Sequence, residues 1–355
     1  MIEHIVIPLF VAFFTCVIIG PKVIAILTKQ KMKQTVREEG VEAHLKKSGT
    51  PTMGGIMILI SLFLGSMFYI FRYPEIIPIL ILTFGFGVIG FIDDYLKAIK
   101  KHSDGLKALQ KMILQILVTA AFAVYLTFFT NISLEMLIPF SGGRMIDIGW
   151  FAYVVMFLAV IGTVNGTNFT DGLDGLATSV TVIVAVFFTI VSYFSWLLPR
   201  PLPSDVFSCW GATVIFVYPL TAAMVGALLG FLIFNSYPAK IFMGDTGSLA
   251  LGGFVIGTAY VMQMPLFVLI IGLVYVVEVL SVMIQVVYFK KTGGKRVFKM
   301  TPIHHHFELD SEKISYTPVM NFPKRAWSET RIVTVFTIIT VLFCLIAIMG
   351  LAWWN

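Results

Sequence analysis

Charged residues are scarce in this chain of 355 residues. Only 12% of its residues are charged and 58% are hydrophobic, whereas a soluble domain carries about 25% charged residues. The chain also lacks any long polar stretch from which a separate soluble domain could be built. This composition predicts a single polytopic membrane domain over residues 1–355.

Three further absences each exclude a class of protein. Cysteine occurs only three times, and Cys16 and Cys344 fall in apolar runs, so no disulfide framework is expected. The N-terminus has no positively charged stretch before its first apolar run, which favours an uncleaved first helix over a signal peptide. The net charge of +6 is not arranged as a basic stripe, so we expect no nucleic-acid partner.

Ten apolar runs approach the roughly 20 residues that a helix needs to cross a bilayer core. They cover residues 4–28, 53–71, 76–92, 111–130, 150–166, 175–197, 211–235, 247–263, 266–289 and 332–353. The expected fold class is therefore an all-α integral membrane protein with about ten transmembrane helices. The fifth and eighth runs are the shortest, and we expect any broken or tilted span there. Segment 131–149, with its two adjacent glycines, predicts a small hairpin.

Lysine and arginine are concentrated in alternate loops. Segments 29–47, 97–111 and 290–331 hold most of them, together with Lys240, whereas the opposite loops hold only Arg72, Arg144 and Arg200. The positive-inside rule places the basic loops in the cytoplasm and both termini in the periplasm, which requires an even number of spans.

A pair of adjacent carboxylates, Asp93 and Asp94, stands at the cytoplasmic end of the third run. An acid at the bilayer centre costs roughly 2.5–3.5 kcal/mol, so such a pair is useful where a divalent cation or a proton transfer requires it. Lys97 shares a helical face with Asp93 and could pair with it or with a phosphate. A solvated helix end explains this string equally well.

A ladder of amides and carboxylates follows the fifth run. Asn165, Asn168 and Asp171 recur every three residues, which puts them roughly on one helical face, and Asp174 follows. No lysine or arginine neutralises the two aspartates in this segment. Such a ladder is suited to binding polar ligand edges or a hydrated cation, and less suited to a merely structural turn.

Asp245 is the only acid in its loop, within the sequence FMGDTGS at 242–248. It could bind Mg²⁺, which takes one or two carboxylates together with phosphate oxygens. Gly244, Gly247 and the free N–H groups of the following helix could cradle a phosphate. An ordinary helix N-cap is the alternative.

Three consecutive histidines, His304, His305 and His306, lie in the last cytoplasmic loop. On one extended segment they cannot all face one ion, and they could instead offer protons or hydrogen bonds to a diphosphate. A solvated polar turn is the alternative. In the ninth run Glu278 and Gln285 belong to one polar stripe, which is either functional or a helix-packing feature.

Taken together, these residues resemble the polyprenyl-phosphate N-acetylhexosamine-1-phosphate transferase superfamily. The resemblance rests on KxGTPTMGG at 47–55, DDxxK at 93–97, NxxNxTDGLDGLA at 165–177, FMGDTGSLALGG at 242–253 and PIHHHFE at 302–308. The histidine triplet favours the muramoyl-pentapeptide branch. Gly40-Val41 departs from the Gly-Pro expected there, which puts only a local turn in doubt.

The resemblance implies transfer of phospho-N-acetylmuramoyl-pentapeptide from UDP-N-acetylmuramoyl-pentapeptide to undecaprenyl phosphate. The products would be lipid I, for peptidoglycan biosynthesis, and UMP. The cofactor would be Mg²⁺, and the location the bacterial inner membrane with a cytoplasmic-facing active-site groove. The partners would be these two substrates and membrane lipid, with a homodimer as a further possibility. No ATP-binding motif is needed, because one phosphoanhydride is broken and another is formed, and the sequence has no Walker-type loop.

The resemblance also implies roles for individual residues. Asp245 and Asp171 would bind the metal, and Asp93 would deprotonate the lipid phosphate with Asp94 in support. Phe242 could stack on uracil. The catalytic set is Asp93, Asp94, Asp245 and His304, and the further substrate contacts are Lys47, Thr52, Lys97, Lys111, Asn165, Asn168, Asp171, Asp174, Phe242, Gln285, His305 and His306. Direct attack is favoured over an aspartyl-phosphate intermediate, because loose phosphoryl transfer needs positioning more than covalent help.

Two rival interpretations remain open. One is a sister transferase that uses UDP-N-acetylglucosamine. The other is a secondary transporter for an anionic solute, which would place its charged groups near the midplane of inverted repeats. Here the acids gather at cytoplasmic helix ends and no convincing repeat is found, which disfavours the transporter.

Overall fold

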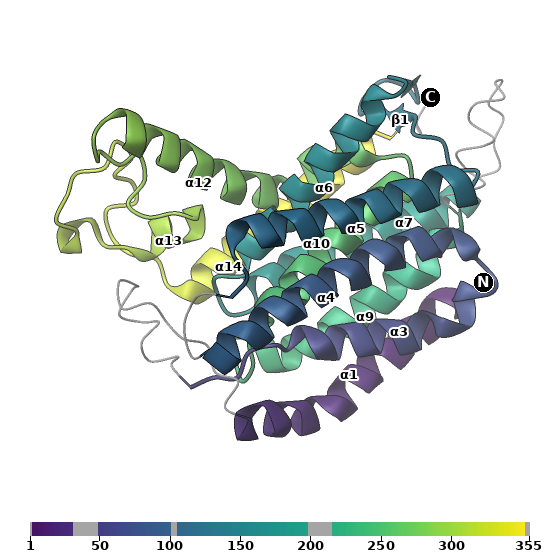
Figure 1. The fold of residues 1–355 in the computed structure, drawn as a ribbon, viewed down its shortest axis with the longest axis horizontal. Coiled ribbons are helices and arrows are strands. Elements are labelled where there is room, and N and C mark those ends of the chain that lie inside the picture. Colours follow the sequence, from purple (N-terminus) through teal and green to yellow (C-terminus); the bar gives the residue numbers. More distant parts are fainter. Residues whose placement is uncertain (1, 31–48, 101–104, 198–214, 352–355) are drawn as a thin grey trace.

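The computed structural model describes residues 2–30, 49–100, 105–197 and 215–351. These residues form a bundle of helices that lie side by side (Figure 1). The helices are α1 (Glu3–Lys29), α3 (Gly55–Ile70), α4 (Ile77–Lys100), α5 (Ala108–Phe129), α6 (Phe151–Thr170), α7 (Leu176–Leu197), α9 (Tyr218–Asn235), α10 (Gly244–Val261), α11 (Val268–Ile271), α12 (Leu273–Lys291), α13 (Ile303–Glu308) and α14 (Glu329–Met349). Short 3₁₀ turns occupy Pro74–Ile76, Ile215–Val217, Pro265–Phe267 and Ser311–Lys313.

All ten expected runs are helical where the structure describes them, but not all are suited to span a membrane. Eight described helices are long and apolar enough, namely α1, α4, α5, α6, α7, α9, α12 and α14. Helix α3 has only 16 residues, and α10 begins with the polar sequence GDTGS. The chain is therefore a multi-pass membrane protein, while the count of ten spans and the side of the termini remain predictions.

The break that we expected in the fifth or eighth run lies elsewhere. The fifth run is the continuous helix α6 and the eighth is the continuous helix α10. The ninth run is instead divided at Gly272, which separates α11 from α12. Glycine has one of the lowest helix propensities, so interrupting the helix at this residue loses little helical stability.

The expected hairpin in segment 131–149 is confirmed. Strand β1 (Met136–Leu137) pairs antiparallel with β2 (Met145–Ile146). Gly142 and Gly143 between them have φ of +73° and +87°, values that glycine adopts without a steric penalty. Figure 1 shows this hairpin at the end of the bundle where both chain termini are marked, and α12 and α13 project at the opposite end.

Helix α10 is the centre of the bundle. Every residue from Thr246 to Val261 is buried, and glycines let neighbouring backbones approach it closely. A Cβ at Gly90 of α4 would lie 2.0 Å from the carbonyl oxygen of Asp245, and one at Gly55 would lie 2.1 Å from the nitrogen of Gly247. Helices inside a membrane associate largely through such close packing of small residues. The start of α10 is therefore held tightly between α3 and α4.

Candidate active site

The Asp245 carboxylate lies at the start of α10, where side chains from three other helices meet it. Its Oδ2 accepts hydrogen bonds from Lys97 Nζ at 3.0 Å and Lys111 Nζ at 2.9 Å. Its Oδ1 accepts one from Asn168 Nδ2 at 2.9 Å. These residues come from α4, α5 and α6, so four helices far apart in sequence converge on one carboxylate.

A second carboxylate, Asp93, shares a lysine with Asp245. Asp93 Oδ2 lies 2.7 Å from Lys97 Nζ and 3.9 Å from Lys111 Nζ. Its Oδ1 accepts a hydrogen bond from the backbone nitrogen of Leu106 at 2.6 Å. Of the two partners predicted for Lys97, Asp93 or a phosphate, the structure shows the pairing with Asp93. We refer to Asp93, Lys97, Lys111, Asn168 and Asp245 as the acid–lysine cluster.

Asp94 has a different position from its neighbour. It is 4% exposed, and its two oxygens accept hydrogen bonds from the backbone nitrogens of Asp245 and Thr246 at 3.2 and 2.9 Å. The Thr246 hydroxyl donates a third at 2.7 Å. Asp94 therefore caps the first turn of α10, where a carboxylate is favoured by the exposed N–H groups and the helix dipole. The N–H groups of Asp245 and Thr246 are therefore not free to cradle a phosphate, while a phosphate contact with Gly247 stays a prediction.

The two aspartates of segment 165–177 have different hydrogen-bond partners. The pKa of Asp171 is raised well above its usual value, first by burial and then by the negative charges of Asp245, Asp94 and Asp174; a hydrogen bond from the Gly244 backbone opposes this. Asp171 thus borders the acid–lysine cluster. Asp174 Oδ2 instead accepts from the backbone nitrogen of Ala239 at 2.9 Å, which ties it to the chain before α10.

The two asparagines of this segment also face different partners. Asn165 exchanges hydrogen bonds with Gln115 of α5, at 3.1 and 3.4 Å. Asn168 belongs to the acid–lysine cluster and also donates to Ser248 Oγ at 2.8 Å. No sequence pattern marks Gln115, because it is a single polar residue within an apolar helix, whereas Ser248 ends the FMGDTGS sequence but was given no role of its own.

Thr52 and Phe242 lie on two chain segments that pair beside the cluster. Phe242 donates its backbone N–H to Pro51 and accepts one from Gly54, both at 2.9 Å. A Cβ at Gly244 would lie 2.7 Å from both Thr52 Oγ1 and Asp94 Oδ2, so the threonine hydroxyl is close to the start of α10. The partly exposed Phe242 ring remains a candidate for stacking. Lys47 lies outside the described residues.

The three histidines form part of a short helix, α13, and not the extended segment that we expected. They face three different partners. His304 Nδ1 lies 3.0 Å from Glu278 Oε1 of α12. His305 Nδ1 lies 2.6 Å from Glu308 Oε2. His306 Nδ1 accepts from the backbone nitrogen of Lys299 at 3.0 Å.

His306 also binds the backbone through its other nitrogen, Nε2, which donates to the Phe322 carbonyl at 2.8 Å. Burial lowers the pKa of His306, against the opposing effect of the Phe322 carbonyl. Both ring nitrogens of His306 are therefore bound to backbone. The role of His306 in this structure is to hold the loop that follows α12.

Gln285 and Lys299 hold the same loop. Gln285 Oε1 accepts from the backbone nitrogens of Val297 and Phe298 at 2.9 and 3.0 Å. The Lys299 side chain is fully buried, and its Nζ donates to the carbonyl of Leu309 at 2.6 Å and to that of Pro323. Burial lowers the pKa of Lys299. No sequence pattern distinguishes Lys299, because it is one of several lysines in a basic loop.

The donor set around Asp245 fits Mg²⁺ by its chemistry. Within the described ranges, no three His, Cys, Asp or Glu side chains are gathered closely enough to form a metal cage. Mg²⁺ does not require one, since it usually takes one or two carboxylates and keeps water or phosphate oxygens. Four aspartates lie at or beside the cluster, Asp93, Asp94, Asp171 and Asp245, against the two lysines Lys97 and Lys111. Asp245 and its neighbour Asp171 can supply the one or two carboxylates that such a site takes.

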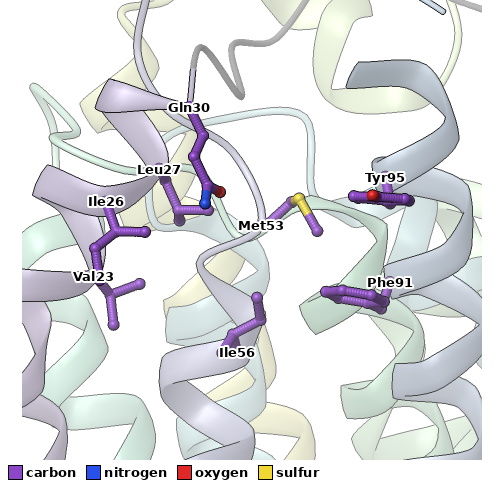
Figure 2. A pocket seen from close by; sticks show the side chains of 8 residues that line it. All are labelled: Val23, Ile26, Leu27, Gln30, Met53, Ile56, Phe91 and Tyr95. Atoms are coloured by element: carbon purple, nitrogen blue, oxygen red, sulfur yellow. The ribbon is translucent and has the colours of Figure 1, made fainter. Parts of the chain in front are cut away.

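An apolar groove of about 240 Å³ lies on another side of α4 (Figure 2). Phe91 and Tyr95 of α4 line it with stacked rings, opposite Val23 and Leu27 of α1 and beside Met53. Successive helical residues are about 100° apart, so Asp93 points to the face of α4 away from Phe91 and Tyr95. The groove and the acid–lysine cluster are therefore separate.

Comparison with known proteins identifies the family. The family description "glycosyl transferase family 4" matches residues 76–264, and the first signature of the phospho-N-acetylmuramoyl-pentapeptide-transferases matches residues 47–59. The transferase of that name from Acetivibrio thermocellus is 48% identical over 96% of this chain and 93% of its own. Those from Clostridium botulinum strain Alaska E43 and Clostridium perfringens strain 13 are 45% and 43% identical, over 97% and 98% of this chain and 95% and 98% of their own.

These matches extend over the motifs that supply the acid–lysine cluster, the cap of α10 and the histidine helix. The cluster thus lies in a membrane-embedded transferase of peptidoglycan synthesis. The chain belongs to the phospho-N-acetylmuramoyl-pentapeptide-transferase family.

Proposed function

We propose that this chain transfers phospho-N-acetylmuramoyl-pentapeptide from UDP-N-acetylmuramoyl-pentapeptide to undecaprenyl phosphate at the cytoplasmic face of the inner membrane. The names of relatives that cover nearly the whole chain support this reaction. The observation that carries it is the lysine shared by two carboxylates, Lys97 between Asp93 and Asp245. This arrangement suits the joining of two anionic phosphates.

In the proposed reaction an oxygen of the lipid phosphate attacks the sugar-linked phosphorus of the donor. A new P–O bond forms, the bond from that phosphorus to the bridging oxygen breaks, and UMP leaves with the bridging oxygen. Asp93 accepts the proton of the lipid phosphate. Lys97 and Lys111 neutralise charge on the phosphates, because phosphoryl transfer depends mainly on alignment and electrostatic stabilisation.

Asp245 and Asp171 are the residues that would hold Mg²⁺. When bound, the cation would neutralise charge on the diphosphate. Asn168 orients the Asp245 carboxylate through its hydrogen bond to Oδ1. Asp94 fixes the backbone of Asp245 by accepting a hydrogen bond from its N–H.

The test is an assay of detergent-purified protein with UDP-N-acetylmuramoyl-pentapeptide and undecaprenyl phosphate, in which UMP and the lipid product are measured. We expect UMP and a lipid-linked phospho-muramoyl-pentapeptide in equal amounts, only with the lipid and Mg²⁺ present. Activity with UDP-N-acetylglucosamine in place of the muramoyl donor would move the chain to the sister branch. If the folded protein releases no UMP with either donor, the proposal is overturned.

A further inference from the structure

A buried polar pair joins α12 to α13. The Glu278 side chain lies in the first half of α12 and has no exposed surface, and the His304 side chain is 1% exposed. Glu278 Oε1 lies 3.0 Å from His304 Nδ1. Placing an acidic side chain within a helix that is apolar enough to span a membrane costs free energy. Such residues are usually paired and functional. The pair therefore calls for an explanation beyond helix packing.

The pairing determines which nitrogen of His304 carries a hydrogen. A carboxylate oxygen accepts a hydrogen bond from Nδ1–H, and in that tautomer Nε2 is the acceptor nitrogen of the ring. Among the residues that the structure describes, no hydrogen-bond partner is found for His304 Nε2 or Glu278 Oε2. A buried polar atom without a partner is rare and calls for a ligand or a functional explanation.

The Nε2 atom faces the loop that borders the acid–lysine cluster. A Cβ at Gly172 would lie 2.1 Å from His304 Nε2 and 2.6 Å from Cε1, so only glycine lets the ring come this close. Gly172 follows Asp171, whose carboxylate is hydrogen-bonded to the backbone of Gly244, next to Asp245. A short path of contacts thus leads from Nε2 to the cluster.

We propose that Glu278 is a positioning residue, which holds His304 so that Nε2 accepts a hydrogen bond from an O–H or N–H group of the nucleotide-sugar donor. This inference rests on the proposed function, because it requires the donor to reach the Asp171–Gly172 loop. His306 does not offer the same atom, since both of its ring nitrogens are bound to backbone.

The orientation can be measured without turnover. Solid-state NMR of protein labelled with ¹⁵N-histidine in lipid reports which ring nitrogen carries the hydrogen, and the chain has only six histidines. We expect the Nδ1–H tautomer for His304 and the opposite, Nε2–H, for His306, which is the internal reference. Loss of the Nδ1–H signal in His304→Gln assigns it. An Nε2–H tautomer at His304 in the unaltered chain would overturn the proposal.

Two substitutions at Glu278 separate positioning from packing. Glu278→Gln keeps an acceptor oxygen, so we expect the His304 tautomer to persist and kcat/KM to fall less than tenfold. Glu278→Leu removes the acceptor, so we expect the Nδ1–H tautomer to be lost and kcat/KM for the donor to fall about 10- to 100-fold, as when a histidine loses its outer partner. An unchanged tautomer in Glu278→Leu would contradict the inference.

A double-mutant cycle with His304→Ala completes the test. We expect Glu278→Leu to cause no further loss of kcat/KM when His304 is already alanine, because its effect acts through the imidazole. A further loss of similar size would assign Glu278 to packing and overturn the proposal. Thr181→Val, which removes a buried hydrogen bond to Tyr275 of α12, is the matched control and should leave kcat/KM near that of the unaltered chain. Failure of the unaltered chain to use the donor would refute the proposed function, while the tautomer measurement would still decide the role of Glu278.

Discussion

Lys97 of α4 and Asp245 of α10 meet across the bundle with Nζ and Oδ2 3.0 Å apart, and the same Nζ lies 2.7 Å from Asp93. One ammonium group thus neutralises two carboxylates that come from different helices. Lys111 adds a second contact to Asp245 at 2.9 Å. The two lysines supply positive charge directly to these carboxylates. We therefore expect that removing either lysine changes the charge balance of the site most directly.

Lys97→Gln should reduce kcat by about 10²–10³-fold, the usual cost of removing one group that stabilises charge in a transition state. Gln keeps a hydrogen-bond donor but removes one of the two positive charges that lie beside Asp93 and Asp245. The measurement is steady-state UMP release at saturating donor and lipid. Lys107→Gln is the control, because Lys107 is exposed at the start of α5. Equal rates in both variants would remove Lys97 from the reaction.

Asp94→Ala should destabilise the protein by about 2 kcal/mol or more, because three hydrogen bonds to a charged acceptor are lost at the start of α10. The melting temperature of the detergent-solubilised protein measures this loss. Asp94→Asn keeps one acceptor oxygen and should recover part of the stability. An Asp94→Ala protein with unchanged melting temperature but no activity would show that the carboxylate serves the reaction and not the helix cap.

Gly90→Ala should destabilise the protein by about 1–3 kcal/mol, because overpacking forces the backbone or its neighbours to move. The new Cβ would lie 2.0 Å from the carbonyl oxygen of Asp245, which is backbone and cannot rotate away. Gly162→Ala in α6 is the control, since no atom lies within 4 Å of its Cβ position apart from its chain neighbours and the nearby backbone of its own helix. The comparison is the melting temperature of the two variants, and equal values would contradict the close contact between α4 and α10.

The loop after α12 should lose stability as the pH falls. Because burial lowers the pKa of His306 in the folded protein, the unfolded chain takes up a proton at higher pH than the folded one. Stability from this group is therefore fully present above the ordinary histidine pKa of about 6.5 and is lost progressively below it. Limited proteolysis of the loop between pH 7.5 and 5 measures this change. In His306→Gln the pH dependence should be smaller; an unaltered dependence would exclude His306 as its source.

The sequence predicted the helices well because lipid requires long apolar runs. It did not predict the break at Gly272, since hydropathy is high on both sides and the separation of α11 from α12 is visible only in the fold. Similarly, hydropathy predicts α10 to be one more membrane-spanning helix. In the structure its first turn is a polar site enclosed by α3, α4 and α6.

Local spacing predicted local contacts and missed distant ones. The pairing of Asp93 with Lys97 follows from helix geometry and was one of the two partners that the sequence predicted for Lys97. The capping of α10 by Asp94 joins residues 151 positions apart, and no sequence motif marks it. The histidine triplet was recognised as a unit, but only the fold shows that its members face Glu278, Glu308 and the backbone of Lys299.

The most direct test of the central claim compares UMP release by the unaltered chain and by Asp245→Asn over a range of Mg²⁺ concentrations. We expect release from the unaltered chain only with undecaprenyl phosphate and Mg²⁺, and none from an Asp245→Asn protein with the same melting temperature within a few degrees. Normal rates in Asp245→Asn at low Mg²⁺ would contradict the account, because they would remove Asp245 from both the metal site and the reaction.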